Sequence, residues 1–160
     1  MPRISDFALL ERPEQYALAI THNLNSAEQL PSLIGGGYQQ LAAYLEELGE
    51  LLTDNPYVAY RPKGGSGFSM ENGFSAEIGF TVIRPFPAKG EILPLVIPAR
   101  KEASCMYLGP YLDMAPVYGE MMGWMAAKNL RGSGAVYEFY YNGPDTQPEH
   151  YLTKIVMPLA

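Results

Sequence analysis

Apolar residues recur at helical spacing in two stretches of the chain and form short alternating or continuous runs elsewhere. The spacing predicts one helix through Tyr38–Leu48, which Gly49 is placed to end. It predicts a second helix through Tyr118–Met125, with Pro116 in its first turn after a capping Asp113. Strand-like runs lie at 14–22, 57–60, 74–83, 91–95, 102–108, 136–141 and 152–157, and a glycine-rich loop is expected at 63–67.

The two halves of the chain share this order of strand, helix, strand and strand. When the sequence is shifted by 80 residues, Tyr38 meets Tyr118 and Tyr60 meets Tyr140. We therefore expect an α+β fold built from two such repeats, related by an approximate two-fold axis. It would have one antiparallel sheet, two helices packed against the sheet, and a central groove.

The expected organisation is a single domain over residues 1–160, with repeat one at about 5–84 and repeat two at about 90–159. Apolar residues make up 48% of the chain, enough for a real core, which excludes a wholly disordered protein. The net charge of −6 and the absence of a basic stripe argue against sequence-independent DNA binding. Because residues 1–20 do not form a secretory signal and no run is long enough to cross a membrane, we expect a cytoplasmic protein.

Candidate chemistry centres on Glu138, a lone acidic residue in the aromatic run from Ala135 to Asn142. A carboxylate in apolar surroundings is costly unless something compensates for its charge. It could be satisfied structurally by a tyrosine, Lys154 or Arg100, or it could form the acidic floor of a ligand site. Twelve tyrosines supply rings that attract cations by about 0.5–2 kcal/mol each.

Other chemistries have little support in the sequence. His22 and His150 lack partners at metal-ligand spacing, so no metal site is predicted. The glycine triplet at 35–37 is expected just before a helix, but no phosphate-binding motif follows it, so no cofactor is predicted either. The single cysteine, Cys105, lies in an apolar run and is interpreted as a small core residue.

The order of the C-terminal motifs resembles the gyrase-inhibitor-like family. These motifs are Gly109-Pro110-Tyr111, a helix ending near Trp124, the Tyr-Glu-x-Tyr-x-Asn run at 137–142, and the Thr-x-Ile run that starts at Thr153. The resemblance covers nearly the whole chain. It implies the fold of the effector-binding domains of AraC- and MerR-type regulators, here without a DNA-reading segment, and a groove for bulky, flat, hydrophobic or cationic compounds.

The family's key acidic residue falls on Glu138. Two departures are Tyr107, where many relatives have histidine, and Lys154, where many have glutamate. The resemblance and the aromatic pattern together give the candidate ligand-binding residues Glu138, Trp124, Tyr137, Tyr140, Tyr60, Tyr107, Glu77 and Met121, with Glu138 catalytic only if the protein is an enzyme.

Three functions follow as hypotheses. The first is a stand-alone protein that senses or sequesters hydrophobic or cationic aromatic small molecules. The second is a hydrolase of strained cyclopropane-bearing genotoxins, in which a glutamate and an aromatic residue act together, as the resemblance implies. The third is an inhibitor that interacts with gyrase or with a regulator as a protein partner.

Overall fold

The computed structural model describes residues 3–63, 71–143 and 145–160, so most of the predicted glycine-rich loop at 63–67 lies outside the described residues. Its contacts group the chain into two compact units. Unit 1 combines Met1–Arg12 with Arg100–Ala160, and unit 2 is Pro13–Ala99. Each unit is an antiparallel sheet with one α-helix.

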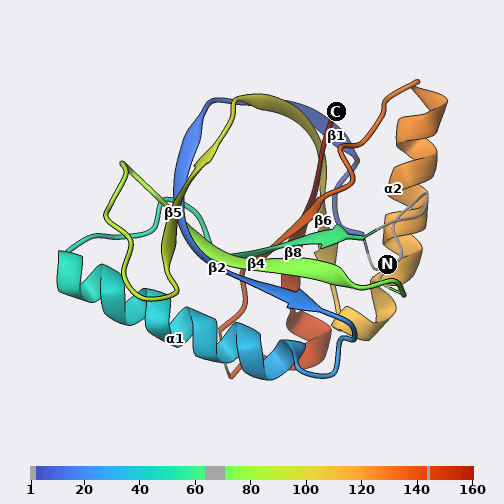
Figure 1. Cartoon of the computed structure of the whole chain (residues 1–160). Helices are drawn as coiled ribbons and strands as arrows, with labels where there is room; N and C mark the ends of the chain where they lie inside the picture. Colours follow the sequence, from blue (N-terminus) through green and yellow to red (C-terminus); the bar gives the residue numbers. More distant parts are fainter. Residues whose placement is uncertain (1–2, 64–70, 144) are drawn as a thin grey trace. The chain divides into compact units, whose positions relative to one another are not determined.

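Unit 2 runs strand, helix, strand, strand, with a further strand after them (Figure 1). Its sheet has the order β5-β2-β4-β3, and every neighbouring pair is antiparallel. The elements are β2 (Gln15–Leu24), α1 (Leu30–Leu48), β3 (Tyr57–Pro62), β4 (Phe74–Val82) and β5 (Leu93–Ile97).

Helix α1 is longer than its apolar spacing predicts. It ends at Leu48, and the N–H of Gly49 bonds back to carbonyls of the last turn, which confirms the predicted stop. The expectation that the glycine triplet precedes the helix is wrong, because 35–37 lie inside it. A Cβ on Gly37 would stand 3.0 Å from Cγ2 of Ile78, so the missing side chain lets α1 approach β4 closely.

A buried carboxylate on β4 is satisfied within unit 2. Tyr57 donates a hydrogen bond to Oε2 of Glu77 at 2.7 Å, and Arg61 contacts Oε1 at 3.0 Å. Tyr57 lies opposite Gly79 in the β3–β4 register. A Cβ at Gly79 would lie only 2.5 Å from the Tyr57 hydroxyl oxygen, so this glycine makes the space in which the ring reaches Glu77.

Unit 1 contains the same order of strand, helix, strand and strand. A further strand, from the beginning of the chain, precedes this order (Figure 1). The sheet order is β1-β6-β8-β7, again antiparallel at each pair. The elements are β1 (Ala8–Arg12), β6 (Arg100–Leu108), the 3-10 helix η1 (Tyr111–Asp113), α2 (Ala115–Ala127), β7 (Val136–Tyr140), the 3-10 helix η2 (Pro148–His150) and β8 (Leu152–Pro158).

Helix α2 begins with a proline in its first turn, as predicted. Asp113 is not its cap. Asp113 belongs to η1, and Met114 occupies the cap position without a side-chain hydrogen bond. The buried side of the helix is formed by Val117, Met121 and Met125. These methionines are therefore core residues that fasten α2 to its sheet.

The α+β prediction is confirmed: the described residues form antiparallel strands, and each unit has one α-helix. Each half contains the predicted order of strand, helix, strand and strand, and β1 is a further strand that the sequence pattern did not predict. The two-fold relation between the halves, the single-domain boundaries and the repeat limits stay predictions.

Substituting Gly79 with alanine should lower the free energy of unfolding by about 1–3 kcal/mol, because the new methyl group would overlap the Tyr57 ring. Gly36→Ala is the matched control. It lies inside α1 with no atom within 4 Å of a Cβ, so it should raise the free energy of unfolding by up to about 1 kcal/mol. Urea denaturation measures both, and equal effects would contradict this account.

Candidate functional site

Glu138 lies on the face of the unit 1 sheet that α2 covers. Side chains alternate along a strand, so Glu138 and Tyr140 share one face of β7. The register places Glu138 opposite Ile155 and Tyr140 opposite Thr153 on β8. Tyr118 reaches the same face from α2 and donates a hydrogen bond to the Glu138 carboxylate.

Two tyrosine hydroxyls bind the two carboxylate oxygens of Glu138. Tyr118 donates to Oε2, and Tyr140 donates to Oε1 at 2.8 Å. Part of the residue remains accessible, yet desolvation of the carboxylate is the dominant influence and raises the pKa of Glu138 above its ordinary value. The two hydrogen bonds act in the opposite direction and do not cancel it. Protonation therefore requires less acid here than at an exposed glutamate.

The cations considered as partners for Glu138 lie elsewhere. Lys154 is the cross-strand neighbour of Phe139, on the other face of β7, with its ammonium 4.3 Å from the Phe139 ring centroid. Arg100 pairs with Glu102 at 3.0 Å. The ion pairs found among the described residues do not include Glu138. The sequence left a tyrosine, Lys154 or Arg100 as structural partners of Glu138, and in the structure tyrosines take this role.

A group of further aromatic residues extends from Glu138 toward solvent. The Tyr111 ring stacks on Tyr151 at 4.8 Å between centroids and meets Tyr140 edge-on at 5.5 Å. Tyr111 is 44% exposed, and Asn142 donates a hydrogen bond from Nδ2 to its hydroxyl at 3.1 Å. Burial raises the pKa of Tyr111, and the negative charge of Glu138 is a smaller contribution in the same direction.

Tyr118, Tyr111, Tyr151 and Asn142 were missing from the residues chosen from the sequence. Tyr118 could have been found, since it belongs to the helical stripe and any residue in that stripe can face a strand. Tyr111 and Asn142 come from segments after β6 and β7, and no periodic pattern reports that these two segments meet.

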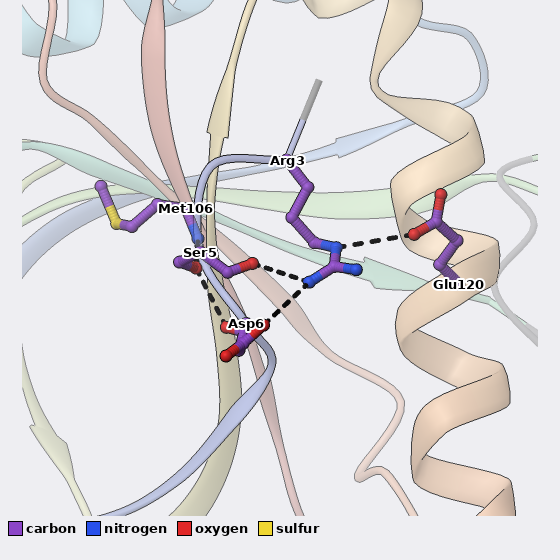
Figure 2. Close-up of polar contacts among 5 residues, drawn as sticks. All are labelled: Arg3, Ser5, Asp6, Met106 and Glu120. Atoms are coloured by element: carbon purple, nitrogen blue, oxygen red, sulfur yellow. Dashed lines mark hydrogen bonds and ion pairs between the residues drawn. The ribbon is translucent and has the colours of Figure 1, made fainter. Parts of the chain in front are cut away.

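The segment that begins at Arg3 contacts both α2 and β6 (Figure 2). Arg3 forms an ion pair with Glu120 of α2 at 3.5 Å, and its guanidinium also donates to the carbonyl of Ser5 at 2.7 Å. The Ser5 hydroxyl in turn accepts the N–H of Met106 on β6 at 2.8 Å. This segment thus links α2 to β6, and α2 is the helix that presents Tyr118 to Glu138.

Several of the predicted site residues have structural partners in unit 1. Trp124 contacts Phe7 with ring centroids 5.7 Å apart, and Met121 is fully buried. The buried Tyr107 donates to the carbonyl of Pro110 at 2.6 Å, and desolvation raises its pKa. Tyr137 lies on the other face of β7 from Glu138, with the Arg100 guanidinium 4.5 Å from its ring. Of the chosen residues, only Tyr140 touches the Glu138 carboxylate.

The remaining two predicted residues belong to unit 2. Tyr60 is buried on β3 beside Phe74, with ring centroids 6.3 Å apart. Glu77 is bound by Tyr57 and Arg61, as described above. Their participation in ligand binding stays a prediction.

Cys105 is buried, and desolvation raises its pKa to about 11, which fits the prediction of a core residue and leaves little thiolate at neutral pH. The described residues contain no group of three or more His, Cys, Asp or Glu side chains placed to hold a metal ion. None of the helices in the described ranges combines the length and hydropathy that a membrane crossing requires.

A sequence profile of the GyrI-like small-molecule-binding domain matches residues 5–160. The chain belongs to this family. The match confirms the resemblance drawn from the C-terminal motifs. A search of curated proteins gave no significant match.

Several solved structures share this fold. The C-terminal domain of EcmrR is 22% identical with a TM-score of 0.75, and the match covers 98% of each chain. This chain spans 57% of the EcmrR chain in its DNA complex, with 19% identity and a TM-score of 0.76.

Two further neighbours are almost fully covered by the match. SAV2435 bound to tetraphenylphosphonium is 16% identical over 98% of this chain and 94% of its own, with a TM-score of 0.62. A hydrolase encoded by lin2189 from Listeria innocua is 15% identical over 99% and 93%, with a TM-score of 0.65. These likenesses establish the shared fold.

Glu138→Gln should change how stability depends on pH. Because the folded-state pKa of Glu138 is raised, the folded protein binds this proton more tightly than the unfolded chain does. The free energy of unfolding should therefore fall as pH rises from the ordinary glutamate value of 4.5 through the folded-state pKa, by about 1.4 kcal/mol per unit of difference.

This fall should be absent in Glu138→Gln and retained in Glu46→Gln, a change of equal charge on the exposed side of α1. Urea denaturation at a series of pH values from acid to neutral measures it. Parallel curves for the wild type and Glu138→Gln would show that the carboxylate is not desolvated.

Proposed function

We propose that unit 1 binds bulky, flat, hydrophobic cations at Glu138, for sensing or sequestration. The observation that carries the proposal is a desolvated carboxylate that is held by tyrosine hydroxyls and is absent from the ion pairs of the described residues. A guest with a positive charge would supply the compensation that the protein gives its other buried acids through arginine.

The neighbouring rings favour the same class of guest. Tyr140 and Tyr111 lie between Glu138 and solvent-accessible surface, and an aromatic face attracts a cation by about 0.5–2 kcal/mol. A flat guest can stack on these rings while its charge approaches the carboxylate. Tyr111, the most exposed of them, is the side chain that can move without disturbing buried residues.

The family and one neighbour support this reading. The family is defined by small-molecule binding, and SAV2435 was solved with tetraphenylphosphonium, a bulky aromatic cation. A role in sensing has the further support of EcmrR, whose domain of the same fold occurs in a DNA complex. Direct DNA contact is no part of the proposal for this chain.

Glu138→Gln should weaken binding of a flat cationic dye at least tenfold, because it removes the charge and keeps the shape. Wild-type affinity should rise with pH through the pKa of Glu138, since the cation competes with the bound proton, and binding should release a proton. Isothermal titration calorimetry in two buffers of different ionisation enthalpy measures affinity and proton release together.

Glu46→Gln is the charge-matched control for this titration. Its exposed carboxylate belongs to α1 of unit 2, whereas the tyrosines that bind Glu138 belong to unit 1, so dye affinity should stay within about twofold of wild type. If Glu138→Gln and wild type bind the dye equally at every pH, Glu138 is not the anchor and the proposal fails.

A hydrolase is the second candidate, favoured by the protonation behaviour of Glu138. A carboxyl group with a raised pKa keeps its proton to a higher pH than an ordinary glutamate and can act as a general acid there, and its two hydroxyl partners hold it in one orientation. The fold likeness to a Listeria innocua hydrolase is compatible with this chemistry. The proposed substrate class is strained cyclopropane-bearing compounds.

Turnover separates the two candidates. A hydrolase would convert many equivalents of a cyclopropane-bearing alkylator per protein molecule, and Glu138→Gln would abolish this turnover. Chromatography of the product measures the conversion. A binding protein protects at most one equivalent per site. Sub-stoichiometric conversion by wild type would leave binding as the function.

A further inference from the structure

Asn142 carries a buried polar atom that no group of the described structure satisfies. Its Nδ2 donates to the Tyr111 hydroxyl at 3.1 Å, whereas its Oδ1 is buried without a hydrogen-bond partner. An unmet acceptor in a buried position costs free energy, and a donor brought by a ligand would recover that cost. The Nδ2 group of this amide is bonded to Tyr111, the exposed ring of the aromatic group.

Asn142 follows Glu138 and Tyr140 along the same extended stretch of chain. The ladder to β8 continues one residue past β7, because the N–H of Tyr141 bonds to the carbonyl of Leu152 at 2.9 Å. Alternation therefore places residues 138, 140 and 142 on one side of the strand. Four residues at about 3.3 Å each separate Glu138 and Asn142 by about 13 Å.

We propose that Asn142 is a second recognition point, which accepts a hydrogen bond from an N–H at the far end of an elongated guest whose cationic end meets Glu138. The inference rests on the function proposed above and narrows its ligand class. The preferred guest is a flat cation that bears N–H donors at both ends, such as a diamidine. Onium ions without N–H groups leave Oδ1 unsatisfied.

The tyrosines between the two points fit such a guest. Tyr140 lies midway between Glu138 and Asn142 in the sequence, and Tyr111 meets it edge-on, so an aromatic body can lie along this row while its ends reach the two polar groups. Displacement of the Tyr111 hydroxyl from Asn142 breaks a single hydrogen bond. The Tyr111 hydroxyl thus covers the amide, and it moves aside when a guest reaches Oδ1.

The test uses two probes on the full chain. The first is 4′,6-diamidino-2-phenylindole, a planar dication with an amidinium at each end. The second is its analogue with both amidinium groups fully N-methylated, which keeps both charges and has no N–H. Calorimetry gives the affinity of each for wild type, Asn142→Leu and Tyr111→Phe.

We expect Asn142→Leu to weaken binding of the diamidine about fivefold to tenfold, the size of one hydrogen bond, and to leave the methylated analogue within about twofold. Tyr111→Phe removes the hydroxyl from the amide and keeps the ring, so it should tighten diamidine binding, because the guest no longer has to break the Tyr111–Asn142 bond. This variant separates loss of the Tyr111–Asn142 bond from loss of the acceptor.

Equal weakening of both probes by Asn142→Leu would assign Asn142 a purely structural role and overturn this inference, with the proposed function intact. Unchanged binding of the diamidine would overturn it as well. Failure of both probes to bind wild type would contradict the proposed function itself, and this inference with it.

Discussion

The desolvated carboxylate of Glu138 is the constraint around which unit 1 is organised. A buried negative charge needs donors or a cation, and here two tyrosine hydroxyls from different elements meet it. One hydroxyl comes from β7 itself, so its position follows from strand geometry. The other comes from α2, so the helix must be held at a fixed distance from the sheet, which its buried methionines and the contact of Arg3 with Glu120 accomplish.

Two other buried acids show what the protein does when a carboxylate has only to be neutralised. Glu77 receives a tyrosine hydroxyl and the guanidinium of Arg61. Glu102 lies between Arg12 and Arg100. Removing one partner of such a pair leaves an uncompensated charge, so these acids are fixed parts of their sheets. Glu138 differs in that its donors, within the part of the chain that the structure describes, are hydroxyls alone.

Much of the fold follows from local sequence pattern, because strand alternation and helix spacing reflect one buried face. The pairing of Glu138 with Tyr140 follows from the same alternation, i to i+2 on β7. Which residue of α2 reaches Glu138 depends on the rotation of the helix about its own axis. The helical stripe that includes Tyr118 narrows the choice of this residue without fixing it. The Tyr111–Asn142 contact joins two segments of irregular backbone, so no periodicity reports it. The glycine triplet was misplaced because glycine propensity argues against a helix interior, whereas close packing against Ile78 favours it. A gyrase-interacting role stays a prediction.

The opening residues of the chain have a consequence for how the protein can be handled. Arg3, Ser5 and Phe7 are bonded to or packed against β6 and α2, so they belong to the packed structure of unit 1. Trimming them would remove the contacts of this segment with α2, the helix that positions Tyr118. Affinity at the proposed ligand site would then depend on whether these residues are present. A fusion partner placed at this end would apply force to α2 through the contact of Arg3 with Glu120. Because α2 also carries Tyr118, such a force would couple mechanically to the hydrogen bond between Tyr118 and Glu138.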